Sequence, residues 1–394
     1  MKILIFAEVY FPDVIGGGEF STKMMTEGLA ARGHEIDVYC LGKNNVDEKI
    51  NGINIHRRYV QDISEHFFSK TKNNSIQDTL TTVKKIIKRR ADIYYEKRWY
   101  KHYCKIINDV KPDVVHSVAA LSYLGRFNLW KAAFDNGIPV SHVSRSPNLI
   151  ELQFLGGKLN RYYIHRNAFA SKYLDGMAAP SKYMLECHTK VGIKGRRFND
   201  VIYNAVEFDA IEPTEEFVNN KKNIIIYAGD IRQEKGIATL IEAVQGIPNI
   251  ELLLIGKGAM TSSIKQDEKI RIISWLDKKT LYKYMQKAKI VVLPSEWEEA
   301  FGRILIEGIA NGTLALGSNR GGIPEVLNYD NNFIFESGNV SALQDRLNWV
   351  LSLSTEDYLT IWNRQKSWMN RYSKKNYCDE WERFFSQQIG GSNE

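Results

Sequence analysis

Two acidic residues between Pro294 and Glu307 have types and a spacing that could do chemistry. The segment reads PSEWEEAFGRILIE and follows an apolar stretch typical of a buried strand, so a helix is expected to begin near residue 300. Glu299 and Glu307, eight positions apart, would lie at the helix start and about two turns further on. Carboxylates there can accept hydrogen bonds from vicinal hydroxyl groups, one pair on a sugar and one on a ribose. The same spacing also fits a helix-terminal acid and a solvated glutamate.

The start of this helix could also bind an anion. Its first backbone N–H groups have no partner within the helix, and the helix dipole is positive at that end. These groups would suit a phosphate or a sugar oxygen, and they belong to Ala300, Phe301 and Gly302.

A second segment, from Gly229 to Gly236, carries two cations between small residues. It reads GDIRQEKG and follows the apolar stretch that ends at Ala228. Arg232 and Lys235 could neutralise a diphosphate that approaches the backbone beside the glycines. Taken alone, the segment also fits an exposed basic turn.

A third segment places three consecutive glycines, Gly16, Gly17 and Gly18, after the first apolar stretch. They permit a ligand to approach backbone N–H groups closely, or they form a pliant turn. The run is not the G-x-G-x-x-G of dinucleotide sites, because residue 21 is serine. A nicotinamide cofactor is therefore not expected.

Strand–helix alternation in two regions of the chain would position these segments. Apolar strands are expected at 3–7, 36–41, 113–115 and 139–143, and again at 223–228, 250–255, 290–293 and 313–316. Helical patterns connect them at 19–32, 237–244, 278–288 and 303–310. Such alternation predicts an α/β protein with two Rossmann-like domains facing each other across a cleft, and with ligands at the carboxyl ends of the strands.

Domain boundaries follow from the same pattern. The N-terminal domain is expected to comprise residues 1–206, with a mostly helical insertion at about 60–110. A polar join precedes the C-terminal domain of residues 207–371, and residues 372–394 read as a final helix.

Length and composition agree with a two-domain enzyme. The chain has 394 residues, which is longer than a domain with a single hydrophobic core usually is. Its 44% hydrophobic and 25% charged residues are typical of a globular enzyme. No apolar run has the length of a secretory leader or a membrane span. The widely spaced cysteines predict reduced thiols in a cytoplasmic protein and no zinc site; they are Cys40, Cys104, Cys187 and Cys378.

Together these segments resemble glycosyltransferase family 4, whose members have the two-Rossmann-domain GT-B fold. The resemblance runs almost from end to end. The Glu-x7-Glu run with Phe-Gly inside it is the most specific part. The matching residues are Pro12 with Gly16-Gly17-Gly18, Asp113-Val-Val-His116, Ala179-Pro180-Ser181, Ile202-Tyr-Asn204-Ala-Val, Glu234-Lys235-Gly236, Pro294-Ser295, Glu299-Ala-Phe-Gly302 with Glu307, and Gly321-Gly-Ile-Pro324-Glu325.

The resemblance implies an activity and the residues that serve it. The enzyme would transfer a hexosyl or N-acetylhexosaminyl group, with retention, from a nucleotide-diphosphate sugar (UDP-sugar favoured) to an acceptor hydroxyl, in polysaccharide or glycolipid assembly at the cell surface. Glu307 would hold the ribose, Glu299 a donor-sugar hydroxyl, and Lys235 with a nearby arginine the diphosphate. The nucleotide base would lie by Ile273 and Trp275, and the final helix would return to the N-terminal domain.

The chain departs from the family pattern at two places. Asp230 follows Gly229 where the family usually has arginine, so Arg232 is the candidate replacement. In the N-terminal domain the family usually has a histidine where this chain has Arg145, with His142 three residues earlier. Arg145 is the preferred catalytic cation, and His142 and His116 are candidates for the sugar pocket.

No cofactor or metal is expected. The leaving phosphate itself could take the proton from the acceptor, and cationic side chains could neutralise it. The sequence contains no Asp-x-Asp triplet that would hold a divalent ion at the diphosphate. Two other functions remain open, namely a sugar-nucleotide epimerase of the same fold and a non-catalytic nucleotide-sugar-binding protein.

A basic stretch at 84–101 carries most of the net charge. Its eight basic and two acidic residues give +6 of the chain's +7, which argues against nucleic acid as a partner. As a helix it would place apolar residues on one face and Lys84, Lys85, Lys88 and Arg89 on the other. It could lie on an anionic membrane surface at the cytoplasmic face, near a lipid-linked glycan acceptor, or it could pack on the N-terminal domain with a solvated basic side.

Overall fold

The computed structural model describes residues 1–13, 16–59, 93–118, 126–147, 150, 157–207 and 211–390. They form two compact units. One comprises Met1–Pro180, Met184–Ile202 and Cys378–Glu394, and the other Ser181–Tyr183 and Tyr203–Tyr377. The chain thus leaves the first unit near residue 202 and returns to it near residue 378.

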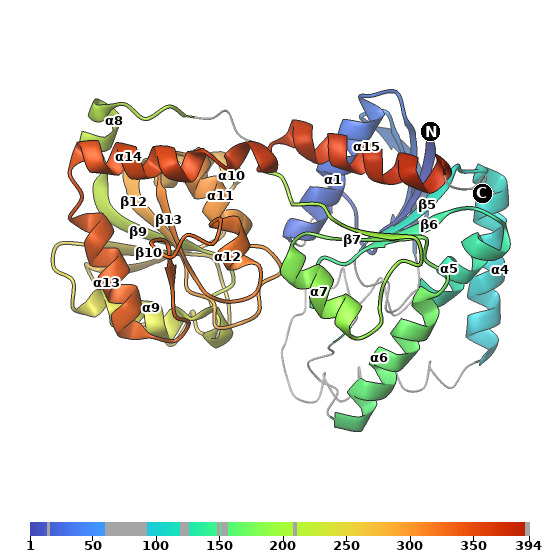
Figure 1. The fold of residues 1–394 in the computed structure, drawn as a ribbon, viewed down its shortest axis with the longest axis horizontal. Helices are drawn as coiled ribbons and strands as arrows, with labels where there is room; N and C mark the ends of the chain where they lie inside the picture. Colours follow the sequence, from blue (N-terminus) through green and yellow to red (C-terminus); the bar gives the residue numbers. More distant parts are fainter. Residues whose placement is uncertain are drawn as a thin grey trace. The chain divides into compact units, whose positions relative to one another are not determined.

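The N-terminal unit is built on an eight-stranded sheet with the order β3-β4-β2-β1-β5-β6-β7-β8 (Figure 1). All neighbours are parallel except β3 and β4, which form an antiparallel pair. Because helices cover both faces of a parallel sheet, the central strands are buried along nearly their whole length rather than at alternate positions. The strands are β1 Lys2–Phe6, β2 Glu35–Leu41, β3 Val46–Ile50, β4 Ile53–Arg58, β5 Val114–Val118, β6 Val140–Val143, β7 Gly176–Ala179 and β8 Phe198–Val201.

Five helices of this unit connect its parallel strands. They are α1 Gly17–Ala30, α4 Ile93–Val110, α5 Arg126–Asp135, α6 Gly157–Ser171 and α7 Lys182–Lys190. The final helix, α15 Lys374–Gly390, connects no strands and belongs to this unit from Cys378 on. Among the described residues, no helix is long and apolar enough to cross a membrane.

Helix α4 occupies the last part of the stretch expected to be an insertion. Tyr103, Ile106 and Ile107 are buried in one hydrophobic core with Leu129 and Trp130 of α5. Residues 93–110 therefore form a core helix that leads into β5, not an accessory segment. Residues 60–92 of the expected insertion lie outside the described residues.

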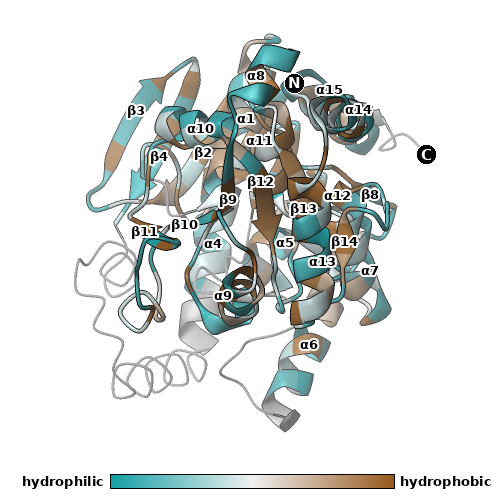
Figure 2. Cartoon of the chain, turned by 90° about the vertical axis from the view of Figure 1, so that its left-hand side faces the viewer, coloured by the Kyte–Doolittle hydropathy of each residue, from teal (hydrophilic) through white to brown (hydrophobic). Residues whose placement is uncertain are grey.

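The C-terminal unit contains a six-stranded parallel sheet with the order β11-β10-β9-β12-β13-β14. Its strands are β9 Lys222–Ala228, β10 Glu251–Ile255, β11 Ile270–Ile273, β12 Ala288–Leu293, β13 Leu314–Ser318 and β14 Ile334–Phe335. Its helices are α8 Glu215–Asn219, α9 Ile237–Gln245, α10 Lys278–Lys287, α11 Arg303–Ala310, α12 Ile323–Val326, α13 Val340–Leu351 and α14 Thr355–Lys366, with short 3-10 turns η2 at Gln233–Lys235 and η3 at Met369–Tyr372. Figure 2 shows the hydrophobic colour on β12, while α10 is mainly hydrophilic.

Each sheet has a point at which the strand order reverses. In the C-terminal unit β9 lies between β10 and β12, and in the N-terminal unit β1 lies between β2 and β5. Loops that leave the carboxyl ends of two such strands diverge, and the crevice between them is the usual ligand site of an open α/β sheet. In the C-terminal unit these loops are 229–236 and 294–302, which contain two of the segments singled out from the sequence. The fold therefore confirms the predicted α/β class with two parallel-sheet domains.

A buried lysine gives this unit a predictable pH dependence. Lys221 donates from Nζ to the carbonyls of Gln286 and Ala288 at 2.9 and 2.7 Å, and its ammonium lies 4.7 Å from the Phe217 ring centroid. Burial lowers the pKa of Lys221 from 10.5 to about 7. Between these values the unfolded chain binds more protons than the folded one, so the free energy of unfolding should rise with pH.

We predict that Lys221→Met removes this rise. From pH 7 to pH 9 the wild type should gain up to about 1.4 kcal/mol per pH unit relative to the variant. Urea denaturation at pH 7, 8 and 9 measures the difference. Parallel profiles for the two proteins would show that Lys221 has the same pKa in the folded and unfolded chain.

Candidate functional site

The two loops at the strand-order reversal of the C-terminal unit are bonded to each other. The carbonyl of Glu234 accepts hydrogen bonds from the backbone N–H groups of Glu296 and Trp297, at 3.0 and 2.8 Å. Gly236 is left-handed, with φ +69°, and a Cβ on it would lie 1.9 Å from the carbonyl oxygen of Pro294. Only glycine allows this close approach. The loops after β9 and β12 therefore form one structure.

Lys235 and Glu299 meet within this structure. Lys235 Nζ lies 2.6 Å from Glu299 Oε1, and the two side chains are only 21% and 20% exposed. An ammonium has three donors, so Lys235 can bind a phosphate oxygen while it still holds the carboxylate. The pair therefore places an ammonium, which can donate to a phosphate, beside a carboxylate, which can accept from hydroxyl groups.

A second glycine turn fixes the backbone on the other side of Glu299. The N–H of Gly321 donates to Glu298 Oε2 and that of Gly322 to the Glu299 carbonyl, both at 2.7 Å. Gly321 is left-handed, and a Cβ there would lie 2.2 Å from the Glu299 carbonyl oxygen. The Gly321-Gly322 pair thus holds the two glutamates in position.

Helix α11 begins at Arg303, so Ala300, Phe301 and Gly302 precede its first turn rather than form it. Gly302 is its N-cap, with φ +119°, and within the described part of the chain the N–H groups of Ala300, Phe301 and Gly302 donate no hydrogen bond. Phe301 is buried beside Tyr203 and Tyr372, at centroid distances of 6.2 and 5.6 Å. The backbone is anchored while its N–H groups remain available to an oxygen ligand.

Glu307 lies in the second turn of α11 and is buried, with 6% of its surface exposed. Lys278 Nζ lies 3.5 Å from Glu307 Oε1. Burial lowers the pKa of Lys278, and the nearby Glu307 partly opposes this shift. The Tyr282 hydroxyl is buried and has no hydrogen-bond partner among the described residues, and burial raises its pKa. Lys278 and Tyr282 carry no sequence signature, and the sequence analysis missed them.

Ile273 and Trp275, which were expected near the base, lie at the end of β11, next to the ends of β9 and β10. The Gly229 N–H donates to the Ile255 carbonyl, and the Gly256 N–H to the Ile273 carbonyl, at 3.0 and 2.8 Å. Gly256 packs so closely that a Cβ would lie 2.0 Å from the Gly229 carbonyl oxygen and 3.6 Å from the Trp275 ring. Trp275 is 55% exposed, so its indole offers a flat face to a planar ligand.

Arg232 is placed differently from Lys235. Its guanidinium is half exposed and lies 3.6 Å from an Asp230 carboxylate oxygen and 3.9 Å from a Glu234 oxygen. The hydroxyl of Tyr227 holds this turn by donating to the Asp230 carbonyl at 2.7 Å. Arg232 thus lies in the same loop as Lys235. Its guanidinium is paired with Asp230 and Glu234, whereas Lys235 is paired with Glu299.

In the N-terminal unit, Arg145 reaches the glycine turn that opens α1. Its Nη1 donates to the Gly18 carbonyl at 2.8 Å. Gly17 begins α1, and the N–H of its N-cap, Gly16, donates to Glu19 Oε2 at 2.8 Å. The structure thus brings together Arg145, Gly17 and Gly18, three of the residues selected from the sequence.

His116 is a core residue, which corrects its assignment to a sugar pocket. Its side chain is fully buried, and Nδ1 lies 2.8 Å from the Ser141 hydroxyl. The imidazole contacts Trp381 and Phe385 of α15 at centroid distances of 5.1 and 5.2 Å. Burial lowers the pKa of His116 well below its usual range, so the ring is neutral.

His142 is buried on the other face of the sheet, and its assignment to the sugar pocket is corrected too. His116 is in register with Ser141 and His142 with Ser117, so the two imidazoles point in opposite directions. His142 Nδ1 lies 2.8 Å from the Ser117 hydroxyl, and its ring lies 5.3 Å from that of Trp130 in α5. Between His142 and Arg145, only Arg145 contacts the glycine turn.

We predict that Arg145→Ala lowers the rate of the expected sugar transfer at least about tenfold, or by roughly 1.4 kcal/mol, because the preferred catalytic cation of the N-terminal unit is lost. Steady-state rates of Arg145→Ala, His142→Ala and the exposed control Arg161→Ala test this. His142→Ala should affect stability rather than turnover. A rate loss confined to His142→Ala would reverse the assignment.

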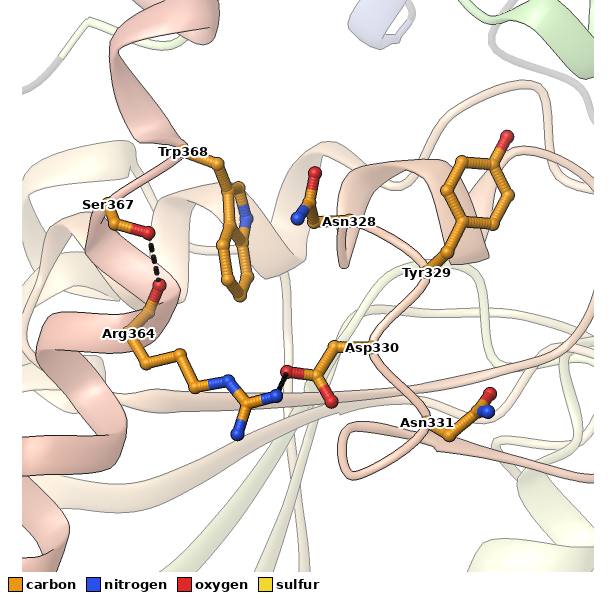
Figure 3. Close-up of a pocket in the computed structure, with 7 residues that line it drawn as sticks. All are labelled: Asn328, Tyr329, Asp330, Asn331, Arg364, Ser367 and Trp368. Carbon is orange, nitrogen blue, oxygen red and sulfur yellow. Dashed lines mark hydrogen bonds and ion pairs between the residues drawn. The ribbon is translucent and has the colours of Figure 1, made fainter.

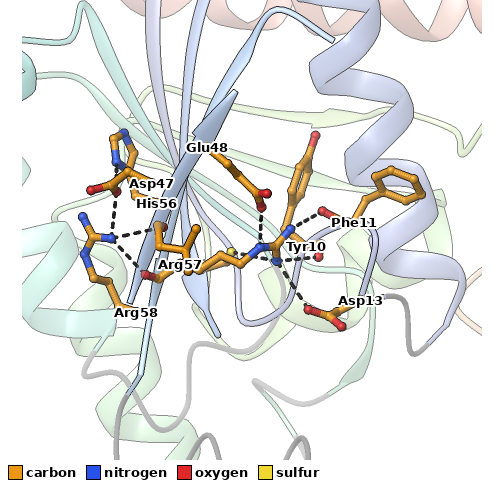
Figure 4. A network of polar contacts seen from close by, with 10 residues as sticks. Tyr10, Phe11, Asp13, Asp47, Glu48, His56, Arg57 and Arg58 are labelled. Carbon is orange, nitrogen blue, oxygen red and sulfur yellow. Dashed lines mark hydrogen bonds and ion pairs between the residues drawn. The ribbon is translucent and has the colours of Figure 1, made fainter. Parts of the chain in front are cut away.

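A buried arginine anchors the segment that leads to the glycine turn (Figure 4). Arg57 of β4 donates to the carbonyls of Tyr10 and Phe11 at 3.1 and 2.6 Å, and to Glu48 at 2.6 Å. Asp13 lies 3.5 Å from the same guanidinium. These contacts fix residues 10–13 after β1; sequence reasoning did not single out Arg57.

Comparison with known proteins agrees with this geometry. Residues 15–210 match the family model "Glycosyltransferase Family 4", and residues 209–368 match "Glycosyl transferases group 1". An uncharacterized 42.6 kDa protein in the cps region of Klebsiella pneumoniae is 28% identical, over 83% of this chain and 87% of that protein. An uncharacterized glycosyltransferase of Methanocaldococcus jannaschii is 26% identical, over 96% of both.

A solved structure shares the fold along the whole chain. HepE of Anabaena, crystallised with UDP and glucose, has a TM-score of 0.68 at 14% identity, over 98% of this chain and 99% of that one. At this identity the likeness concerns the fold alone. The two family models together span residues 15–368, and the chain belongs to glycosyltransferase family 4, with the two-domain GT-B architecture.

Proposed function

We propose that this protein is a retaining glycosyltransferase that moves a hexosyl or N-acetylhexosaminyl group from a nucleotide-diphosphate sugar to an acceptor hydroxyl, with a UDP-sugar as the favoured donor. The observation that carries the proposal is the Lys235–Glu299 pair, held at 2.6 Å where the strand order reverses. It lies beside the available N–H groups at the start of α11, so cation, carboxylate and backbone donors converge.

Each part of the donor then has a partner in the C-terminal unit. The diphosphate binds Lys235 and the N–H groups of residues 300–302, and Arg232 adds charge when it turns from Asp230. The ribose hydroxyls bind Glu307, and the base stacks beside Trp275 and Ile273. Glu299 accepts a hydrogen bond from a donor-sugar hydroxyl.

The reaction needs charge stabilisation more than a protein base. The bond between the anomeric carbon and the phosphate oxygen breaks, and the acceptor oxygen bonds to the same face of that carbon. The acceptor proton passes to the departing phosphate oxygen. Negative charge grows on the diphosphate, and preorganised donors aimed at it lower the barrier. We propose that Lys235 and Arg232 neutralise it without a divalent metal, and that Arg145 is the catalytic cation of the N-terminal unit.

One experiment separates the transferase from an epimerase of the same fold and from a non-catalytic binder. Purified protein is incubated with UDP-, GDP- and ADP-sugars in excess chelator, and the products are separated by anion-exchange chromatography. A transferase slowly releases nucleoside diphosphate even without acceptor, an epimerase returns an isomeric nucleotide sugar, and a binder leaves every donor intact. Release that requires added magnesium or manganese would contradict the metal-independent part of the proposal.

For the acceptor we propose a lipid-linked glycan at an anionic, cytoplasmic membrane surface. Support comes from the charge of the 84–101 stretch and from the relative named for a cps region. Residues 84–92 lie outside the described residues. The end of the stretch packs on its own unit, since the ring of Trp99 stacks on Tyr103 at 5.9 Å and the hydroxyl of Tyr100 donates to Asp135 at 2.6 Å.

The protein should therefore sediment with vesicles that contain anionic lipid, and less so as salt rises, because the charges are screened. Binding should be lost, with donor hydrolysis intact, when five basic residues become glutamine: Lys84, Lys85, Lys88, Arg89 and Arg90. A control carries five exposed lysines of the C-terminal unit changed likewise: Lys222, Lys265, Lys279, Lys283 and Lys287. If the wild-type protein does not bind these vesicles at low salt, the membrane proposal is wrong and the acceptor is a soluble molecule.

A further inference from the structure

A hollow in the C-terminal unit lies away from the residues assigned to the donor (Figure 3). It has a volume of about 530 Å³ and lies between the loop after α12 and the end of α14. Small-molecule sites typically span roughly 300–1,000 Å³, so the size suits one small ligand. Its lining residues are Asn328, Tyr329, Asp330, Asn331, Arg364, Ser367 and Trp368.

Trp368 brings a buried donor to this hollow. The residue is 93% buried (7% exposed), and its indole Nε1 has no hydrogen-bond partner among the described residues. Buried donors in folded proteins are almost always bonded, so an unbonded one at the wall of a hollow calls for an acceptor from a ligand or ordered water. Figure 3 shows the indole beside the hollow, with its nitrogen on the side of Asn328.

The opposite wall is an ion pair without net charge. Asp330 Oδ2 lies 2.5 Å from an Arg364 nitrogen, and Asp330 Oδ1 accepts from the backbone and side-chain nitrogens of Asn332 at 3.1 and 2.9 Å. The Asp330 side chain is 9% exposed, whereas that of Arg364 is 51% exposed. The wall therefore presents guanidinium N–H donors, and its carboxylate disfavours a phosphate or another anion.

At the rim of the hollow, the exposed ring of Tyr329 is carried by a backbone in the left-handed conformation. Tyr329 is 62% exposed and, like Asn328, has a left-handed φ, +56° and +54° respectively. The Tyr329 N–H donates to the Pro324 carbonyl at 2.7 Å, and the Asn328 N–H to the Glu325 carbonyl at 3.1 Å, so the surrounding structure maintains this conformation. The Asn328 side-chain oxygen accepts from Arg371 Nη2 at 2.9 Å, which leaves its amide N–H groups for other partners.

We propose that this hollow is a saccharide-binding site, separate from the donor site, that holds part of the glycan acceptor or product. A sugar ring is neutral, its hydroxyls both donate and accept, and its C–H faces pack on aromatic rings. The hollow matches these properties with an indole N–H, amides, a charge-compensated wall and the Tyr329 ring. The choice of a saccharide rests on the proposed transferase function, while the existence of a ligand rests on Trp368.

The test follows the indole resonance of Trp368 in ¹⁵N-tryptophan-labelled full-length protein. Trp368→Phe identifies the signal by its loss. The probes are the methyl glycosides of glucose, galactose, mannose and N-acetylglucosamine, with saturating UDP present to occupy the donor site. We expect at least one glycoside to shift the Trp368 signal in a saturable way, and Tyr329→Ala to weaken that binding at least tenfold. Tyr59→Ala, which changes an exposed tyrosine of the other unit, should leave it unchanged.

Three results would overturn the site. The Trp368 signal could stay fixed with all four glycosides, it could shift equally in Tyr329→Ala, or it could respond to inorganic phosphate but to no glycoside. Slow donor hydrolysis by the same samples keeps the two proposals distinguishable. Trp368→Phe and Tyr329→Ala should hydrolyse donor like the wild type, so hydrolysis without glycoside binding would reject the saccharide site alone.

Discussion

Replacing Lys235 by alanine should lower kcat/KM for the donor by about 10²–10³-fold. Lys235 is the cation that the fold holds most rigidly at the loop junction, 2.6 Å from Glu299 and four-fifths buried. Removal of one preorganised donor from a developing oxyanion typically costs this much, or about 2.7–4 kcal/mol of transition-state stabilisation. The loss should fall mainly on kcat, because the diphosphate gains further negative charge as its bond to the sugar breaks.

Lys283→Ala is the matched control, since Lys283 is an exposed lysine on α10 of the same unit. Initial rates of nucleoside diphosphate release at several donor concentrations separate kcat from KM. Equal rates for Lys235→Ala and Lys283→Ala would mean that the diphosphate does not lie at Lys235.

Replacing Glu307 by alanine should weaken the binding of the nucleoside diphosphate by about 10–100-fold. A hydrogen bond to a charged group contributes about 1.5–3 kcal/mol, and Glu307 is buried where the ribose hydroxyls are expected. Lys278, 3.5 Å away, would lose its carboxylate neighbour, and its pKa would fall further. Glu307→Gln keeps the shape of the side chain and separates this charge effect from the loss of the acceptor.

Calorimetric titration with UDP measures the effect, with Glu242→Ala on the exposed side of α9 as control. Glu299→Ala should by contrast bind UDP nearly as well as the wild type and lose turnover, because its partner is the sugar. Unchanged UDP affinity in Glu307→Ala would show that the ribose does not bind Glu307.

The sequence was sufficient for the sheet class and for the loops that carry the site. Continuous apolar stretches predicted β9 and β12, because strands buried on both faces are apolar along their length, and the loops were placed where these stretches end. The short edge strands β11 and β14 were missed, since four and two residues give too little periodicity to recognise. Helix α4 was interpreted as part of an insertion because its polar residues conceal the buried Tyr103 and Ile107.

Most predicted residues of the candidate site lie in loops, whereas Glu307 lies in α11 and was recognised by its spacing from Glu299. Lys235 and Glu299 are far apart in the sequence, yet both follow central strands, so their meeting follows from topology. His116 and His142 were assigned to the sugar pocket from the sequence, but both lie within strands that are covered on both faces. In such strands the sequence does not show which face of the sheet a side chain is on, or what covers it. The role of Arg57 could not be predicted from the sequence, because it depends on contacts with residues that are distant in the chain.

A crystal structure of the protein with bound UDP would show where the donor lies. We expect the diphosphate within hydrogen-bond distance of Lys235 Nζ and of the N–H groups of Ala300 to Gly302, with the ribose at Glu307. Lys235 should keep its contact with Glu299, because an ammonium has donors for both partners. A nucleotide bound at the glycine turn of α1, in the Trp368 hollow, or through a metal ion at the diphosphate would contradict this placement of the donor.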